Sequence, residues 1–166
     1  MLIALISDTH LPRGNRRLPD ACVERIREAD LLLHAGDFTT VETLRDLEAI
    51  GPPLLGVHGN IDGAELRRLL PAERVVEAAG ARIAMVHDGG PRPGRLDRLR
   101  QTYGGHADAV VFGHSHLPLH EERHGFQIFN PGSPTERRRA PRHTMGIARV
   151  EEGAVSFELV PLDESR

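Results

Sequence analysis

The sequence predicts an α/β fold with two β-sheets, and three features support this prediction. The amino-terminal half alternates short apolar runs with helical patterns, which is typical of a parallel sheet covered by helices. The rest consists mostly of short apolar runs separated by turns, which favours antiparallel strands. The chain has 166 residues, of which 39% are hydrophobic and 27% charged. This length supplies one substantial core, so we expect residues 1–166 to form a single domain.

The first half predicts a β-α-β-α-β unit. Continuous apolar runs indicate strands that are covered on both faces, and they occupy residues 2–6, 31–33 and 54–57. Helical patterns that end before glycine or proline follow these strands. The expected helices open at Leu18-Pro19-Asp20, span residues 41–50, and span residues 64–70.

The second half predicts hairpins around one more helix. Hairpins are expected where two apolar runs flank a glycine turn, at residues 74–86, 119–129 and 145–160. Residues 95–103 predict a helix, and residues 109–112 predict a buried strand. We therefore expect this half to be mostly antiparallel.

Polar side chains that can bind metal ions follow each of the strands that end at residues 6, 33, 57, 86 and 112. They are Asp8, His10, Asp37, Asn60, His87, His114 and His116. Because ligand sites on open α/β sheets gather at the carboxyl ends of strands, we expect these seven residues to lie close together.

These seven side chains provide enough ligands for two metal ions. If Asp37 bridges, each ion has four protein ligands and keeps positions for water and substrate, as in a catalytic site. Two divalent ions carry more positive charge than Asp8 and Asp37 neutralise, which favours a phosphate group. Water shared by two ions has a lowered pKa and can attack phosphorus in line. The mixture of histidine and carboxylate ligands favours Mn, Fe, Zn or Ni over Ca.

The order and spacing of these motifs resemble the calcineurin-like metallophosphoesterases. The motifs that carry the resemblance are Asp8-x-His10, Gly36-Asp37, Gly59-Asn60, His87 and Gly113-His114-x-His116. Asn130-Pro131-Gly132-Ser133 and the short chain are similar to the small bacterial and archaeal phosphodiesterase branch. The resemblance implies a four-layer αββα sandwich with two mixed sheets.

The resemblance also assigns ligands to two divalent ions. The first ion is expected to take Asp8, His10, Asp37 and His116, and the second Asp37, Asn60, His87 and His114. Among these residues we expect Asp37, Asn60 and His114 to take part in catalysis. Mn is the metal we expect first, with Fe, Zn or Ni as alternatives.

The chain departs from the family at Ile61. Many members carry histidine directly after the Gly-Asn pair, where it protonates the leaving oxygen. Isoleucine cannot donate a proton, and a general acid typically contributes about 10²–10⁴-fold to the rate. We therefore expect a phosphodiesterase that favours good leaving groups.

Several neighbouring residues have two interpretations each. Asp62 either orients a ligand or water or forms a turn, and His34 and His58 either orient metal ligands or bond only to backbone. Arg13, with Arg16 and Arg17, follows the first motif and could reach a substrate anion. The arginines of residues 137–142 either hold a phosphate or a nucleic-acid backbone, or form a solvated loop.

Other functions and partners are weighed on the same sequence. The rivals are a phosphomonoesterase or protein phosphatase, and a non-catalytic protein-binding scaffold of the same fold. The net charge of −3 gives no basis for a nucleic-acid or membrane partner. The apolar run at residues 2–6 is too short for a signal peptide, so we expect a cytoplasmic protein. Its partner is a small phosphate ester, and homo-oligomerisation is left open.

Overall fold

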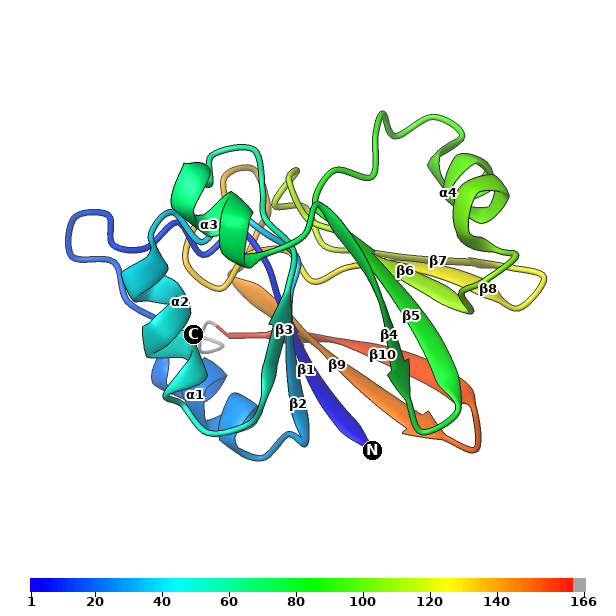
Figure 1. The fold of residues 1–166 in the computed structure, drawn as a ribbon, viewed down its shortest axis with the longest axis horizontal. Coiled ribbons are helices and arrows are strands. Elements are labelled where there is room, and N and C mark those ends of the chain that lie inside the picture. The colour runs from blue at the N-terminus through cyan, green and yellow to red at the C-terminus, as the bar shows by residue number, and fades with distance from the viewer. Residues whose placement is uncertain (163–166) are drawn as a thin grey trace.

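The computed structural model describes residues 1–162. The last four positions of the predicted domain, residues 163–166, lie outside the described residues. Within the described range, ten strands form two five-stranded sheets and four helices pack against them (Figure 1).

The first sheet has the strand order β10-β9-β1-β2-β3. Its strands are β1 Leu2–Ile6, β2 Leu31–His34, β3 Leu54–Gly56, β9 Thr144–Glu151 and β10 Ala154–Pro161. β1, β2 and β3 are parallel neighbours, as the β-α-β-α-β pattern predicts. The hairpin of β9 and β10 joins this sheet through an antiparallel ladder between β9 and β1. The amino-terminal strand therefore lies in the middle of the sheet.

The second sheet has the order β4-β5-β6-β8-β7. Its strands are β4 Glu73–Ala78, β5 Ala81–Val86, β6 Ala109–Val111, β7 Leu119–Arg123 and β8 Phe126–Asn130. Both outer ladders are antiparallel hairpins, but β6 is parallel to β5 and to β8. The expectation of mostly antiparallel pairing is thus wrong for the middle of this sheet. A helix connects β5 to β6, and such a crossover brings the second strand back parallel to the first.

The helices are α1 Asp20–Arg27, α2 Val41–Glu48, α3 Ala64–Leu69 and α4 Arg95–Tyr103. The Thr40 hydroxyl caps α2 by accepting a hydrogen bond from the Thr43 amide. α2 ends two residues before the predicted boundary, and α3 ends one residue early because Leu70 is extended before Pro71. Among residues 1–162, none of the helices combines the length and hydropathy that crossing a bilayer requires.

The apolar side chains form three layers of core, which produce the four-layer αββα sandwich. Along β1, Ile3 and Leu5 point toward the second sheet, whereas Ala4 and Ile6 face α1 and α2. α4 covers the outer face of the second sheet. Figure 1 shows α1 and α2 on one side of the molecule, α4 on the other, and both sheets between them. The predicted fold class is confirmed.

Candidate metal centre

The seven predicted ligands lie on turns that follow β1, β2, β3, β5 and β6. Five of them have left-handed backbone conformations: Asp8 (φ 56°), His10 (46°), Asp37 (63°), His114 (67°) and His116 (60°). Residues other than glycine rarely adopt this conformation, and such strain concentrates at functional sites. The sharp turns aim short polar side chains back toward the sheet edge.

Asp37 lies between two imidazoles. Its Oδ2 is 3.3 Å from His10 Nε2 and 3.3 Å from His87 Nε2. All three side chains are buried or nearly so. One carboxylate oxygen therefore faces both halves of the site, as the resemblance implies for a residue that bridges two ions.

Asp8 occupies the other side of the cluster. Its Oδ1 lies 3.4 Å from His116 Nε2 and 3.9 Å from His10 Nε2. The Ser7 hydroxyl (2.7 Å) and the His114 amide (3.0 Å) donate hydrogen bonds to Asp8 Oδ2. Because these donors hold Oδ2, Oδ1 is directed at the imidazoles.

Asn60 and His114 form the exposed side of the site. Asn60 Oδ1 lies 3.1 Å from His87 Nε2 and 2.9 Å from His114 Nδ1. Both Asn60 and His114 are exposed, whereas the other five predicted ligands are buried. The structure thus brings all seven residues together in one cluster that opens to solvent at Asn60 and His114.

The glycines of the motifs leave room for the carboxylates. A Cβ atom on Gly59 would lie well inside van der Waals contact with Asp37 Oδ1. A Cβ atom on Gly113 would collide in the same way with the Ser7 hydroxyl and crowd Asp8 Oδ2. Glycine precedes Asn60 and His114 because the backbone passes directly beside the ligand side chains.

Hydrogen bonds to the remote ring nitrogens orient two of the histidines. His87 Nδ1 donates to the Ala35 carbonyl (2.7 Å), and His116 Nδ1 donates to the Glu136 carbonyl. In both rings the Nε2 atom then lacks a proton in the neutral form and faces a carboxylate. This is the arrangement that metal-binding histidines typically adopt.

The cluster fits divalent cations. Two buried ring nitrogens, His10 Nε2 and His116 Nε2, have no hydrogen-bond partner within residues 1–162. Asp8, His10 and His116 form one group that could hold a metal ion, and Asp8, Asp37 and His87 form another. Buried polar atoms normally have partners, so orphaned imidazole nitrogens beside carboxylates indicate cation ligands.

The charges in the cluster are strongly coupled. Burial lowers the pKa of His10, but contacts with the Asp37 and Asp8 carboxylates outweigh it and raise that pKa to about 9. Burial likewise opposes ionisation of Asp37, yet His10 and His87 hold its pKa well below the usual range. Two buried carboxylates thus attract positive charge, which protons or metal ions can supply.

Glu136 is part of this site and was missed in the sequence. Its carboxylate Oε2 lies 3.3 Å from His10 Nδ1, and its carbonyl accepts the hydrogen bond from His116. It therefore orients two predicted ligands from the loop between β8 and β9. The only signal in the sequence is its position three residues after Ser133. This spacing does not predict a contact with His10 or His116, because that contact depends on how the loop folds.

The Asn130-Pro131-Gly132-Ser133 motif fastens the same loop to the metal turns. Asn130 Nδ2 donates to the Gly113 carbonyl (2.9 Å), and Ser133 Oγ donates to the Asp8 carbonyl (2.8 Å). Ser133 Oγ also accepts a hydrogen bond from the Glu136 amide (2.8 Å). This motif positions the ligands through the backbone.

Asp62 organises two of the turns. It is buried, and its carboxylate accepts hydrogen bonds from the amides of Asp37 (3.0 Å), Thr39 (2.8 Å) and Gly59 (2.7 Å). Arg67, which was also missed, donates to the carbonyls of Gly59, Asn60 and Asp62. Asp62 therefore joins the turns after β2 and β3 and acts on the backbone of Asp37.

His34 and His58 bond to backbone and to a hydroxyl. His34 Nδ1 accepts from the Gly36 amide (3.1 Å), so its Nε2 donates to the Thr9 hydroxyl (3.1 Å). Complete burial lowers the pKa of His34 to about 3, which keeps it neutral. His58 contacts only the Gly59 carbonyl (3.4 Å). Neither histidine touches a ligand side chain through a described hydrogen bond.

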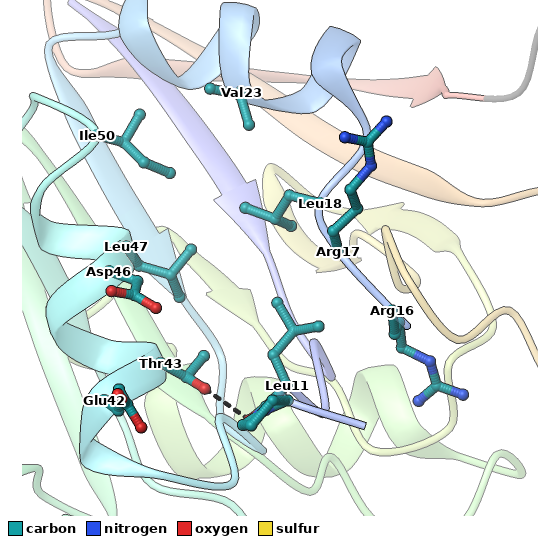
Figure 2. Close-up of a pocket in the computed structure, with 11 residues that line it drawn as sticks. Leu11, Arg16, Arg17, Leu18, Val23, Glu42, Thr43, Asp46, Leu47 and Ile50 are labelled. Carbon is teal, nitrogen blue, oxygen red and sulfur yellow. Dashed lines mark hydrogen bonds between the residues drawn. The ribbon is translucent and has the colours of Figure 1, made fainter. Parts of the chain in front are cut away.

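The arginines after the first motif do not enter the cluster. Arg13 is exposed and lies 3.8 Å from Glu136 Oε1, and Arg16 lies 3.5 Å from Glu136 Oε2. Arg16 and Arg17 line a separate hollow of about 550 Å³ between α1 and α2 (Figure 2). Its walls include Leu18 and Leu47, so it is largely apolar. Within residues 1–162, the ion pairs of Arg13 and Arg16 with Glu136 are their connection to the metal cluster.

Residues 1–153 match the family model of the calcineurin-like phosphoesterase superfamily domain. The chain belongs to this superfamily. The family and the metal-ligand groups together support a phosphoester hydrolase that binds divalent metal.

The relatives agree with this assignment. A protein named "Probable metallophosphoesterase" from Methanothermobacter thermautotrophicus is 34% identical over 166 residues, covering 96% of this chain and 92% of the relative. "Phosphodiesterase MJ0936" from Methanocaldococcus jannaschii is 24% identical over 145 residues, covering 80% and 83%. The crystal structure of wild-type Vps29 from Entamoeba histolytica complexed with Zn²⁺ has a TM-score of 0.76 at 21% identity, covering 98% and 100%. The last similarity supports the fold alone.

Proposed function

We propose that this protein is a phosphodiesterase that hydrolyses small phosphodiesters with two divalent metal ions. The observation that carries the proposal is the orphaned Nε2 atoms of His10 and His116 beside the buried Asp8 carboxylate. These ligands lie in a cluster that opens to solvent at Asn60 and His114. When bound, divalent ions supply Lewis acidity and lower the pKa of water at the site.

The predicted ligands form two groups, one for each metal ion. Asp8, His10, Asp37 and His116 would hold one ion, and Asp37, Asn60, His87 and His114 the other. Because Asn60 and His114 are exposed at the mouth, they are the ligands nearest to an incoming phosphate ester. Neither of them is a carboxylate, so they can lie beside a phosphate oxygen without repelling its negative charge.

The mouth also explains the expected preference for good leaving groups. Ile61 is 42% exposed beside Asn60, and its backbone amide donates to Asp37 Oδ1 (3.1 Å). By resemblance to the family, its hydrocarbon side chain takes the place of the histidine that would protonate the leaving oxygen. An aryloxide leaves without protonation more readily than an alkoxide, so aryl diesters are the preferred class.

Mn is the metal that we propose first. Histidine and carboxylate ligands also suit Fe, Zn and Ni, and thiolates are absent from the predicted ligand set. We further propose that the protein acts in the cytoplasm on a small phosphate ester, without nucleic-acid or membrane partners. Formation of homo-oligomers remains open.

The first experiment measures hydrolysis of bis(4-nitrophenyl) phosphate by chelator-treated protein, with and without Mn²⁺. The diester should be cleaved only with metal, and faster than 4-nitrophenyl phosphate. Asp37→Asn removes a carboxylate shared by both halves of the cluster and should lower kcat/KM by at least about a hundredfold. Asp46→Asn, an exposed aspartate on α2, is the matched control and should retain activity.

The alternatives give different results. Faster cleavage of the monoester would favour a phosphomonoesterase or protein phosphatase. If the protein binds Mn, Fe, Zn or Ni yet turns over neither ester, the proposal is wrong and a protein-binding scaffold of the same fold is favoured. Metal analysis of the same samples separates loss of metal from loss of chemistry.

A further inference from the structure

Two hollows adjoin the metal cluster at the turn that carries His114 and His116. Ser115 and Leu117 line both of them. The first hollow, of about 290 Å³, is completed by Arg138 and Arg139. The second, of about 300 Å³, extends toward Arg92 and Arg95. We call these two adjoining hollows the arginine groove.

The floor of the arginine groove is apolar. Leu117 is 41% exposed there, and Pro118, Leu119 and Pro141 line the second hollow. Exposed leucine flanked by prolines and walled by arginines is a surface that suits an amphiphilic ligand. A flat organic group can pack on the floor while the guanidinium groups contact anionic substituents.

At one end of the groove, the positive charges of two arginines are not paired with a carboxylate of residues 1–162. Arg138 and Arg139 are exposed and make no side-chain hydrogen bond or ion pair within residues 1–162. Arg25 and Arg27 on α1 are likewise exposed and unpaired within residues 1–162, whereas Arg123 pairs with Asp97 at 2.7 Å. Arg138 and Arg139 differ from Arg25 and Arg27 because they line a hollow together with Ser115, which lies between the predicted ligands His114 and His116. Unpaired guanidinium groups beside a catalytic centre are ready to bind phosphate through two parallel hydrogen bonds.

The opposite end of the groove, at Arg92 and Arg95, has both positive and negative groups nearby. Arg95 donates to the Gly90 carbonyl (2.7 Å) and packs over the Phe112 ring, so it is held in place. The carboxylates of Asp88 and Glu121 act on Arg95, whereas Arg92 makes no described side-chain hydrogen bond or ion pair. Positive charge therefore prevails at the end formed by Arg138 and Arg139.

The groove is directly coupled to the metal cluster. The Glu136 carbonyl accepts the hydrogen bond of His116, and Arg138 follows two residues later with a left-handed backbone (φ 47°). A ligand that spans from the cluster to Arg138 therefore has only a short distance to cover.

We propose that the arginine groove binds one ester arm of the substrate and that this arm is nucleotide-like, with a flat body and a second phosphate. The inference rests on the proposed function, because the scissile phosphate must lie at the metal cluster. The Leu117 floor contacts the flat body, and Arg138 and Arg139 contact the second phosphate. The substrate class is thus a small phosphodiester that carries a further phosphate.

The test compares two nucleotides that differ only in that phosphate. Calorimetry measures binding of thymidine 5′-monophosphate and thymidine 3′,5′-bisphosphate to Mn-loaded protein. Each has a 5′-phosphate for the metal cluster. We expect the bisphosphate to bind at least about tenfold more tightly, since each charge-assisted contact adds affinity. In Arg138→Gln/Arg139→Gln the two affinities should become equal within about twofold.

A matched double variant controls for net charge. Arg25→Gln/Arg27→Gln removes two exposed arginines from α1 and should keep the wild-type affinity ratio. Equal binding of both nucleotides by the wild type overturns the inference. A ratio that survives Arg138→Gln/Arg139→Gln overturns it as well, and so does a ratio that falls equally in the control.

Hydrolysis of bis(4-nitrophenyl) phosphate by the wild type separates the two proposals. Turnover with equal nucleotide affinities supports the phosphodiesterase and refutes the groove. Selective bisphosphate binding without turnover refutes the phosphodiesterase and the substrate role of the groove, and leaves an anion-binding surface.

Discussion

At the scale of single residues, the site depends on short polar side chains in a rare backbone conformation. Asp8 and His10 tolerate left-handed φ values because neighbouring groups hold them. Ser7 and the His114 amide fix the Asp8 carboxylate, and Glu136 fixes His10. The backbone strain is confined to single residues, whereas two of the groups that hold them, the His114 amide and Glu136, are distant in sequence.

Replacing Ile61 with histidine should restore a proton donor at the mouth of the site. For Ile61→His we expect kcat/KM to rise by up to about 10²-fold on diesters with poor leaving groups and little on nitrophenyl esters. Rates on a series of aryl diesters show how kcat/KM depends on the pKa of the phenol that leaves. Ile61→Asn is the control for a polar side chain without acidity, and an equal change across the series contradicts the prediction.

Glu136→Gln should weaken metal binding while leaving every predicted ligand in place. The Glu136 carboxylate lies beside His10, and its loss should lower metal affinity by about 10- to 100-fold. Titration of the metal-free protein with Mn²⁺ measures this change. Glu122→Gln, on the exposed face of β7, should bind Mn²⁺ like the wild type. An unchanged affinity in Glu136→Gln would mean that the carboxylate does not support the ligands.

At the scale of elements, parallel pairing gathers the ligand turns. β1, β2 and β3 are parallel, so the turns after them meet at one edge of the first sheet. β5 and β6 are parallel as well, which brings the turns of His87, His114 and His116 together at one edge of the second sheet. Hydrogen bonds between these turns, such as those that Asp62 accepts from the amides of Asp37 and Gly59, then set the distances between the predicted ligands.

The strongest of these connections is the Asp62 carboxylate. Asp62→Asn replaces an oxygen that accepts two backbone N–H groups with an NH₂ group, so buried donors lose their acceptor. We expect the free energy of unfolding to fall by about 2 kcal/mol or more, with weaker Mn²⁺ binding. Urea denaturation and metal titration measure the two effects. Asp46→Asn should change neither, and wild-type stability in Asp62→Asn would refute this role.

At the scale of the whole molecule, the site lies across the junction of the two sheets. Four of the predicted ligands follow strands of the first sheet: Asp8, His10, Asp37 and Asn60. The other three follow strands of the second sheet: His87, His114 and His116. The His87 ring donates across this junction to the Ala35 carbonyl. The complete ligand set therefore exists only when both sheets have packed on their common core.

His34 should contribute a loss of stability in mild acid, which can be separated from the opposite contribution of His10. The folded protein keeps this buried ring neutral to about pH 3, whereas the unfolded chain binds a proton below pH 6.5. Since the unfolded state then binds more protons, lowering the pH favours it, by about 2 kcal/mol between pH 8 and pH 5. Urea denaturation of metal-free wild type and His34→Gln isolates this contribution, because His10, whose pKa is raised to about 9, acts in the opposite direction in both proteins. Relative to the wild type, His34→Gln should therefore gain stability as the pH falls. Parallel pH curves for the two proteins would contradict the assignment.

Much of the fold could be predicted because its signals are local. Continuous apolar runs placed β1, β2 and β3 within one residue of their ends, and glycine or proline marked the ends of α2 and α3. The sequence did not predict the parallel pairing of β6 with β5 and β8, since partner choice depends on the crossover and not on strand composition. The hairpin of β9 and β10 was expected, but not its place beside β1.

The sequence could predict that the seven predicted ligands lie together because each follows a strand, and a turn after a buried strand has a defined place in an α/β fold. Their role as ligands stays a prediction. Glu136 contacts His10 and His116, and Asp62 accepts from the Asp37 amide, and these partners are remote in sequence, so only the tertiary structure shows them. Arg67 bonds to carbonyls only five to eight residues away, but no sequence pattern predicts those contacts. The sequence alone thus determined the fold class and the ligand chemistry, because periodicity and side-chain type are local properties. The tertiary structure decided which side chains orient the ligands and where the arginine groove lies, because those contacts form only when distant turns pack together.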